Sequence, residues 1–336
     1  MNNVNNLEII AEIGVNHNGK VSIAKKLIDV AKKSGATAVK FQTYITDNFV
    51  LKKTKKVKYQ INKFKRNESH YEMLKKLELK KNDFKILNNY CKKKQIEFIS
   101  TPYDLESVDL LEKINVKRYK VASADIDDYL LNKKISRTNK KVIISTGMST
   151  IEDIKKIIRL YKKKNVTLLH CVSSYPCKLH HSYISRIIKL NKIFKLPVGF
   201  SDHTLSYEPA IMAYAAGART FEKHLTLSNR MRGPDHKASL NPSHFKIYVE
   251  KLKTAKQIFG DFQNKLLPIE KNMKQTSSKS ITLKKNLKKG QKIKLADITM
   301  KRPGNGLKGI LIPRIIGKKL KKNTKIDTQI KLKDLI

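Results

Sequence analysis

The stretch KVIISTGMSTIEDIKKIIRLYKKKNVTLLHCV (141–172) decides the fold class of this chain. Its two ends, KVIISTG (141–147) and VTLLHCV (166–172), are apolar and rich in β-branched residues. Between them, apolar side chains recur at helical spacing over residues 151–161. A strand, a helix and a second strand in this order predict two parallel strands joined by a crossover helix.

Runs of the same kind lie on both sides of this unit, and most are followed by an amphipathic helical stretch. They are EIIAEIGVN (8–16), AVKFQTY (38–44), EFISTPY (97–103), RYKVAS (118–123), PVGFSDH (197–203) and RTFEKHL (219–225). Eight strand–helix repeats within about 260 residues predict an α/β fold of the closed (β/α)8, or TIM, barrel type. In such barrels, function gathers at the C-terminal ends of the strands.

The sequence also predicts a second, smaller domain after the barrel. We expect the barrel to occupy residues 1–267. The next segment, 268–279, is polar and unperiodic, which is typical of a linker. Residues 280–336 contain short β-like runs punctuated by glycine and proline, and they predict a small β-rich unit.

The composition is strongly basic, with 72 Lys and Arg against 28 Asp and Glu in 336 residues and a formal net charge of +44. Of these 72 basic residues, 62 are lysines. Recognition of nucleic-acid bases and bidentate binding of phosphate both favour arginine over lysine. The lysines fall mostly on polar helix faces, so we expect a solvated surface and no nucleic-acid partner. A basic stretch at 52–66 lies in the longest connection, 45–96; an insertion over the barrel mouth and a mobile surface loop both fit it.

Other features of the composition bear on location. Because 40% of the residues are hydrophobic and they are spread along the chain, wholesale disorder is excluded. Three cysteines without paired spacing give no support to a disulfide framework, which favours a reducing compartment. No apolar run approaches the length of a membrane span, so we expect a cytoplasmic protein with no membrane partner.

Polar residues crowd the predicted strand ends, where a barrel without a function would need few of them. They are Glu12, Asn16, Lys40, Gln42, Thr101, Lys120, Ser123, Ser145, Thr146, His170, Ser173, Ser201, His203, Glu222 and His224. Side chains two apart on a strand share a face. Lys40 with Gln42, Ser201 with His203, and Glu222 with His224 therefore point inward as pairs.

Two histidines in this set suggest a metal site. His203 and His224 end consecutive strands, and neighbouring strands lie about 4.8 Å apart, so both imidazoles could reach one ion. Two histidines with the other positions left to water or substrate oxygen suit Mn²⁺, with Mg²⁺ or Co²⁺ as alternatives.

Two lysines in this set predict a bound anion. Lys40 and Lys120 face the same interior, and two buried, unpaired ammonium groups would be costly. Hydroxyls of Thr101, Ser123 and Ser145 lie on neighbouring strands, so a phosphate or carboxylate is expected between them. The alternatives are that Glu12 or Glu222 neutralises the lysines, or that a lysine forms a Schiff base.

A set of ordered motifs runs along nearly the whole chain. It comprises EIGVNHNG (12–19), VKFQTY (39–44), ISTPY (99–103), STGM (145–148), HCVSSYP (170–176), GFSDHT (199–204), EKHLT (222–226), GPDHKASLNP (233–242) and KRPGNG (301–306). Together they resemble the sialic acid synthase family, which includes N-acetylneuraminate, N,N'-diacetyllegionaminate and pseudaminate synthases. The resemblance implies a C-terminal antifreeze-like SAF domain of β-clip type.

The resemblance implies an enzyme that condenses phosphoenolpyruvate and water with an N-acetylated mannose-type sugar, giving phosphate and a nine-carbon 2-keto acid. His203 and His224 would hold the metal. Glu12 would transfer protons, and Glu222 would be a supporting group near the metal. The residues implied to hold phosphoenolpyruvate are Lys40, Thr101, Lys120, Ser123, Ser145, Ser173 and Ser201. Ser173 stands where other members carry Asn.

The residues implied to contact the sugar are Gln42, Asp125, Tyr175, Asp235 and Arg302. Asp125 stands where some members carry Glu. Because Arg302 lies in the small domain, the resemblance also implies a domain-swapped homodimer whose small domain covers the partner's site. Pseudaminate synthase, another phosphoenolpyruvate-condensing barrel, and a basic nucleic-acid-binding protein with an inactive barrel are the alternatives.

Overall fold

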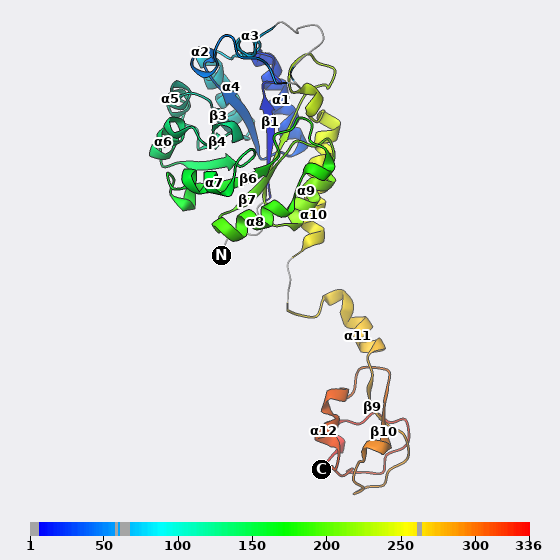
Figure 1. Ribbon diagram of the computed structural model, residues 1–336. Coiled ribbons are helices and arrows are strands. Elements are labelled where there is room, and N and C mark those ends of the chain that lie inside the picture. The colour runs from blue at the N-terminus through cyan, green and yellow to red at the C-terminus, as the bar shows by residue number, and fades with distance from the viewer. Residues whose placement is uncertain (1–6, 58–59, 61–67, 261–263) are drawn as a thin grey trace. The chain divides into compact units, whose positions relative to one another are not determined.

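The structure is a computed structural model that describes residues 7–57, 60, 68–260 and 264–336 (Figure 1). It divides into two compact units, residues 1–260 and 261–336. Most of the segment expected to be a linker, 268–279, is ordered as a 3-10 turn (Pro268–Glu270) followed by helix α11 (Lys271–Ser277).

The first unit is a closed barrel of eight parallel strands in sequence order, with β1 paired to both β2 and β8. The strands are β1 (Glu8–Gly14), β2 (Ala38–Thr43), β3 (Glu97–Pro102), β4 (Arg118–Val121), β5 (Lys141–Ser145), β6 (Val166–Cys171), β7 (Val198–Asp202) and β8 (Thr220–His224). All eight predicted runs contain a strand, so the predicted (β/α)8 barrel is confirmed.

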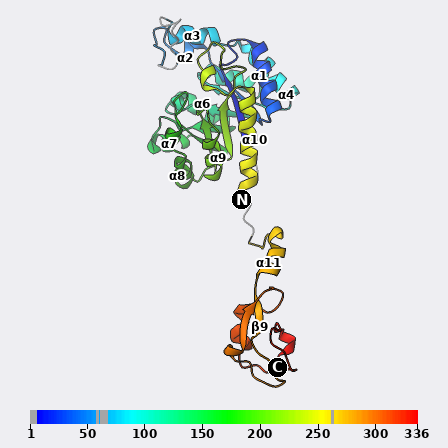
Figure 2. The same cartoon turned by 90° about the vertical axis from the view of Figure 1, so that its right-hand side faces the viewer.

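Helices surround the barrel. They are α1 (Val21–Ser34), α2 (Thr46–Phe49), α3 (His70–Leu77), α4 (Lys81–Lys93), α5 (Leu105–Lys113), α6 (Tyr129–Arg137), α7 (Ile151–Ile158), α8 (Ser185–Phe194), α9 (Glu208–Ala215) and α10 (Pro242–Phe259). Helix α7 shows why they form: Thr150 and Asp153 make a capping box, and Ile154, Ile157 and Ile158 are buried. Helix α10 packs beside α1 and α9 along the outside of the barrel (Figure 2).

The barrel interior changes character along its axis. An apolar layer of Ile10, Ala38, Ile99, Ile143 and Leu169 fills it. Residues two further along the same strands, such as Glu12, Lys40 and Thr101, are polar and also buried. The C-terminal ends of the strands therefore enclose polar groups above an apolar floor.

Charged residues occupy the first positions of four strands, β1, β3, β4 and β5, at the opposite end of the barrel. Arg118 pairs with Glu97 at 2.9 Å and also with Glu8, which accepts a hydrogen bond from Thr220 as well. These contacts connect β1, β3, β4 and β8 at their N-terminal ends.

The second unit is small and β-rich, as expected from the sequence. Strands β9 (Ser280–Leu283) and β10 (Ile298–Lys301) pair antiparallel, isolated bridges add further pairing, and a short helix α12 (Ile312–Ile315) follows. Its own core consists of Ile281, Leu283, Leu287, Ile293, Ile298, Ile315, Leu320, Ile330 and Leu335.

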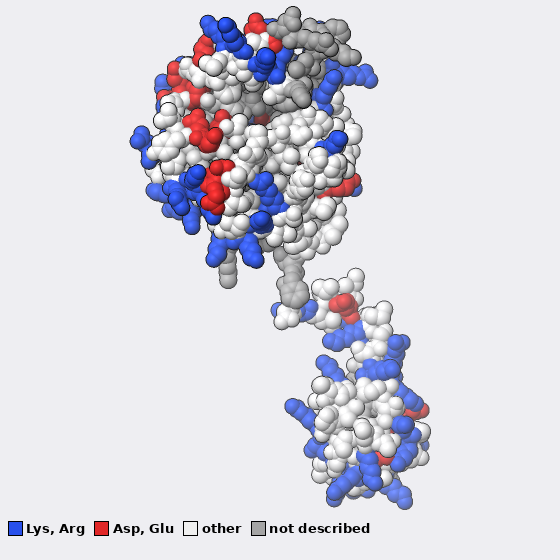
Figure 3. Space-filling view, viewed as in Figure 1, with Lys and Arg blue, Asp and Glu red and all other residues white. Residues whose placement is uncertain are grey.

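Basic side chains are spread over both units. On the face shown in Figure 3, Lys and Arg alternate with acidic and neutral residues and form no single continuous patch. Most of the basic stretch 52–66 lies outside the described residues, so the two interpretations of it stay open. Within the described part of the chain, no helix has the length and apolar character needed to cross a bilayer.

Candidate functional site

The side-chain alternation of the barrel strands brings most of the predicted site residues together at their C-terminal ends. Those that contact at least one other member of the set inside the barrel are Glu12, Lys40, Gln42, Thr101, Lys120, Ser145, Ser201, His203, Glu222 and His224. They come from seven strands and the first residue after β7. Residues up to 212 positions apart in the sequence thus line one interior.

Lys40 sits at the centre of this group. Its Nζ lies 3.0 Å from Glu12 Oε2 and 3.6 Å from Glu222 Oε2, and it donates to Thr101 Oγ1 at 3.2 Å. Burial alone would lower the pKa of Lys40, but the two carboxylates hold it above its usual value. The expectation that Lys40 is an unpaired buried ammonium is therefore wrong, because Glu12 and Glu222 neutralise it, as the alternative interpretation had it.

The two carboxyl groups beside Lys40 differ in their affinity for a proton. Burial raises the pKa of Glu12 to about 7, against the opposing effect of Lys40. Burial would also raise the pKa of Glu222, but Lys120 and Lys40 lower it to about 2, helped by a 2.9 Å hydrogen bond from Ser201. One carboxyl can therefore exchange a proton near neutral pH while its neighbour stays ionised.

Lys120 meets the expectation of an ammonium group without a counterion. Its Nζ donates to Ser145 Oγ at 2.6 Å and to Val121 O at 3.0 Å. No described carboxylate forms an ion pair with it within 4.0 Å; burial lowers its pKa, against the opposing effect of Glu222. A buried cation with neutral partners alone is costly, so this position favours binding of an anion.

Hydroxyl groups and a glycine form a hollow next to β5 and β6. Gly147 N donates to Ser123 Oγ at 3.0 Å, and Ser123 Oγ lies 3.1 Å from Cys171 Sγ. A methyl group added at Gly147 would come within 2.9 Å of Ser123 Oγ and Cys171 Sγ and within 2.7 Å of Ser173 Oγ. The glycine therefore keeps open a space that the predicted Ser123 and Ser173 both face.

His203 and His224 lie together, with ring centroids 5.7 Å apart. His203 Nδ1 lies 2.7 Å from the carbonyl oxygen of Val172, which can only accept, so Nδ1 carries the proton and Nε2 is left as the available donor atom for a metal. Burial lowers the pKa of both rings, that of His224 also through His203.

This pair fits a divalent ion. Neutral imidazole is the form that binds metals, and an outer hydrogen bond like that of His203 typically orients a metal-ligating ring. The buried Nδ1 of His224 has no hydrogen-bond partner in the described part of the chain. The described residues contain no group of three His, Cys, Asp or Glu able to hold a metal, so other ligands would have to be water or substrate oxygens.

One predicted sugar-contacting residue, Tyr175, lies beside the histidines, and two others, Asp235 and Gln42, interact with Lys40 and Glu12. The ring of Tyr175 lies 4.2 Å from that of His203 and 5.9 Å from that of His224. Asp235 is buried, which raises its pKa to about 6, opposed by Lys40. Gln42 Nε2 donates to Glu12 Oε1 at 3.4 Å.

Asp125 lies in the 3-10 turn Ser123–Asp125, which follows β4. Burial, helped by Asp128, raises its pKa to about 7, and its Oδ2 has no hydrogen-bond partner among the described residues.

Asp235 is positioned by two loops that the sequence motifs had marked. Asn16 Nδ2 donates to Leu225 O and to Ser239 Oγ, which in turn donates to Asp235 O at 2.6 Å. In the same way His236 bridges Thr226 Oγ1 at 2.7 Å and Asn18 Oδ1 at 3.2 Å. The loop after β1 and the loop after β8 thus hold each other in place.

Some predicted residues lie elsewhere. His170 was counted among the strand-end groups, but its Nε2 bonds to Ser182 O and its ring stacks on Phe200, because neighbouring residues of a strand face opposite sides. Thr146 likewise donates to Leu169 O. Arg302 is exposed in the second unit.

Two residues at the site were missed. Tyr103 is the residue directly after β3, two positions past Thr101, and its ring lies 4.7 Å from that of Phe49 and 6.4 Å from that of Tyr44. Burial, Asp125 and Glu12 raise its pKa well above the usual value. The period-2 alternation that selected Thr101 would also have selected Tyr103. Gly147 was missed because a glycine offers no chemical group to a search for polar side chains.

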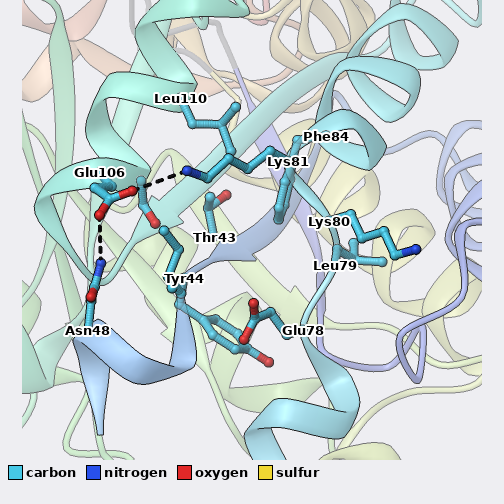
Figure 4. A pocket seen from close by; sticks show the side chains of 12 residues that line it. Thr43, Tyr44, Asn48, Glu78, Leu79, Lys80, Lys81, Phe84, Glu106 and Leu110 are labelled. Carbon is cyan, nitrogen blue, oxygen red and sulfur yellow. Dashed lines mark hydrogen bonds and ion pairs between the residues drawn. The ribbon is translucent and has the colours of Figure 1, made fainter.

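A separate cavity of about 290 Å³ lies between the end of β2, the start of α4 and α5 (Figure 4). Glu106, on its wall, accepts hydrogen bonds from Asn48 and Lys81. None of the predicted site residues lines it. Tyr44, which was not a predicted site residue, lines this cavity, and its hydroxyl donates to Leu74 O.

Comparison with known proteins assigns both units. Residues 27–264 match the NeuB family, and residues 278–336 match the SAF domain. The chain is 40% identical to the N,N'-diacetyllegionaminic acid synthase of Campylobacter jejuni, covering 96% of this chain and 98% of that protein. It is 30% identical to the pseudaminic acid synthase of Helicobacter pylori, covering 98% and 97%.

One solved structure is similar to this chain in both sequence and fold. It is the N-acetylneuraminic acid (sialic acid) synthetase of Leptospira borgpetersenii, in complex with citrate. The TM-score is 0.72 at 30% identity, and the match covers 81% of this chain and 93% of that one.

Proposed function

The chain belongs to the NeuB family, whose relatives named above are synthases, and from this premise we propose that it condenses phosphoenolpyruvate and water with an N-acetylated mannose-type sugar. The products are phosphate and a nine-carbon 2-keto acid of the sialic acid type. The barrel carries the chemistry.

One observation carries this proposal most directly: Lys120 is a buried ammonium whose hydrogen-bond partners, Ser145 Oγ and Val121 O, are neutral. Beside it lie Ser145 and the hollow at Gly147, which Ser123 and Ser173 face. A cation with hydroxyl donors is the chemistry that binds phosphate or carboxylate. Phosphoenolpyruvate, which carries both groups, would satisfy this position and use Thr101 and Ser201 at its edge.

Glu12 is the group we assign to proton transfer. Its carboxyl has a pKa of about 7, so it can accept or return a proton close to neutral pH. When C3 of phosphoenolpyruvate bonds to the sugar's aldehyde carbon, the carbonyl electron pair moves to the aldehyde oxygen, which takes up a proton, and positive character develops at C2. Water adds at C2, and the resulting C2 hydroxyl becomes the keto group, its proton leaving with phosphate. Glu12 takes the proton of that water, and phosphate departs with cleavage of its C–O bond. Glu222, ionised beside Lys40 and Lys120, stabilises the developing positive charge.

His203 and His224 are the residues that would hold a divalent cation, which we propose to be Mn²⁺, with Mg²⁺ or Co²⁺ as alternatives. A bound ion would supply Lewis-acid polarisation of the sugar's aldehyde oxygen. Around it, Gln42, Asp125, Tyr175 and Asp235 would orient the sugar through hydroxyl and N-acetyl contacts. Arg302 would reach the N-acetyl group from the partner of a domain-swapped homodimer.

The identity of the sugar is the next question. Identity is 40% to the legionaminic acid synthase over 96% of this chain and 30% to the N-acetylneuraminic acid synthetase over 81% of it, which favours a 2,4-diacetamido-6-deoxy sugar. The test is a side-by-side assay of phosphate release with N-acetylmannosamine and its 2,4-diacetamido-6-deoxy analogue. We expect the higher kcat/KM with the analogue. A higher value with N-acetylmannosamine would reassign the chain to neuraminate synthesis.

A basic nucleic-acid-binding protein with an inactive barrel is the rival of a different class. It predicts strongly salt-dependent retention of DNA and no phosphate release with either sugar. The proposal predicts phosphate release that requires both substrates.

A further inference from the structure

A buried ion pair lies directly behind the two histidines. Asp202 and Lys223 are register partners on β7 and β8, and Lys223 Nζ lies 2.8 Å from Asp202 Oδ2. Their side chains are 0% and 1% exposed. Lys223 Nζ also lies 5.1 Å from the centre of the Tyr248 ring on α10, so the pair is enclosed between the barrel wall and that helix.

Each member of the pair precedes one of the histidines. Asp202 precedes His203, and Lys223 precedes His224. Because neighbouring residues of a strand face opposite sides, the charges lie outside the barrel wall while the imidazoles face inward.

The pair also fixes the residue that follows His203. Asp202 Oδ1 accepts from Thr204 N at 2.9 Å and from Thr204 Oγ1 at 2.8 Å, and Lys223 Nζ donates to Thr204 O at 2.5 Å. His203 itself accepts from Cys177 N through its carbonyl oxygen. The backbone on both sides of His203 is thus held, although β7 ends at Asp202.

We propose that the Asp202–Lys223 ion pair is a positioning device that fixes His203 and His224 relative to each other. The pair joins the ends of β7 and β8 from behind, so that one imidazole cannot move along the strand direction without the other. The metal in this inference rests on the proposed function, whereas the relative position of the two imidazole rings does not.

General energetics agree with a positioning role. A buried ion pair is weak support for stability by itself, because the cost of removing two charges from water offsets most of their attraction. Apolar side chains would fill the same space between barrel and helix. Apolar side chains would not form hydrogen bonds with the N, Oγ1 and O atoms of Thr204, as Asp202 and Lys223 do.

The test uses Asp202→Asn, Lys223→Met and the double variant in the full-length protein. The first readout is the affinity for Mn²⁺ without substrates, measured by electron paramagnetic resonance of free Mn²⁺. We expect each single variant to weaken it about 10-fold, the lower end of what supporting residues around metal ligands contribute. The double variant should be no weaker than the worse single one, because the two residues act as a unit.

The second readout needs no metal. In protein labelled with ¹⁵N at histidine, the Nδ1 proton of His203, donated to Val172 O, should give a slowly exchanging resonance that exchanges faster in the variants. Glu97→Gln is the matched control, since it removes a partner of Arg118 between β3 and β4 at the other end of the barrel. It should lower the unfolding temperature and leave both readouts unchanged.

The outcomes separate the two ideas. If wild-type protein binds no Mn²⁺ but the His203 resonance responds as expected, the metal assignment fails and the positioning role stands. The positioning role is overturned if folded variants keep the wild-type His203 exchange rate, whatever their Mn²⁺ affinity. It is also overturned if Glu97→Gln changes the His203 resonance as much as Lys223→Met does.

Discussion

Glu12 and Lys40 form an ion pair of 3.0 Å inside the barrel, with side chains 2% and 6% exposed, and Glu222 approaches the same ammonium at 3.6 Å. Two carboxyl groups thus share one cation. The arrangement leaves Glu12 with a pKa of about 7 and Glu222 with one of about 2.

Glu12 makes the stability of the substrate-free protein depend on pH. Its folded-state pKa is raised from 4.5 to about 7, so the folded state binds more protons between these values than the unfolded state does. The stabilisation from this group is complete below about pH 4.5 and is lost as pH rises through 7. Glu12→Gln should remove this part of the pH dependence in urea unfolding curves. A variant whose curve declines between pH 4.5 and 7 as steeply as the wild type would contradict the assignment.

Lys120→Met should weaken phosphoenolpyruvate binding. A hydrogen bond to a charged group contributes about 1.5–3 kcal/mol, so KM for phosphoenolpyruvate should rise about 10- to 100-fold. The same change removes the group that contributes most to the low pKa of Glu222, so that pKa should rise as well. The exposed Lys117→Met, on the same stretch, is the control and should change neither quantity. An unchanged KM in Lys120→Met would remove this lysine from the anion site.

Gly147→Ala should close part of the same site. The added methyl group would lie within 2.9 Å of three side-chain atoms, so Ser123 and Ser173 must shift. Overpacking of this kind costs about 1–3 kcal/mol, and we expect KM for phosphoenolpyruvate to rise about 10-fold while KM for the sugar changes little. Steady-state kinetics with each substrate varied in turn distinguishes the two. A rise confined to the KM for the sugar would mean that this hollow binds the sugar and not phosphoenolpyruvate.

Subunit mixing tests the role of Arg302. Arg302→Ala and His203→Ala should each be inactive alone. If sites are shared across a swapped dimer, co-refolded mixtures should regain up to about a quarter of wild-type activity. This follows from random pairing, in which half of the dimers are mixed and each mixed dimer has one intact site. No recovery in a mixture shown to contain mixed dimers would mean that the small domain serves its own barrel.

Much of the fold follows from period-2 and helical spacing. Alternation within each run predicted which side chains face inward, and it placed Glu12, Lys40, His203 and His224 together correctly. The match of polar residues to strand ends failed at His170, where the alternation pointed outward but the polarity of the side chain was given more weight.

Charge pairing inside the barrel was harder to predict. The sequence shows two inward lysines and two inward glutamates, but which lysine is neutralised depends on register. Glu12 and Lys40 are register partners on β1 and β2, whereas Lys120 on β4 faces Ile143 on β5. Strand register therefore places a carboxylate beside Lys40 and an apolar side chain beside Lys120.

The central claim is that this barrel joins phosphoenolpyruvate to an amino sugar with cleavage of the C–O bond to phosphate. It is tested most directly with phosphoenolpyruvate carrying ¹⁸O at the bridging oxygen, incubated with the enzyme, Mn²⁺ and the 2,4-diacetamido-6-deoxy sugar and followed by mass spectrometry. We predict labelled phosphate and an unlabelled nine-carbon keto acid in equal amounts. Label retained in the keto acid, or phosphate formed without that acid, would contradict the account.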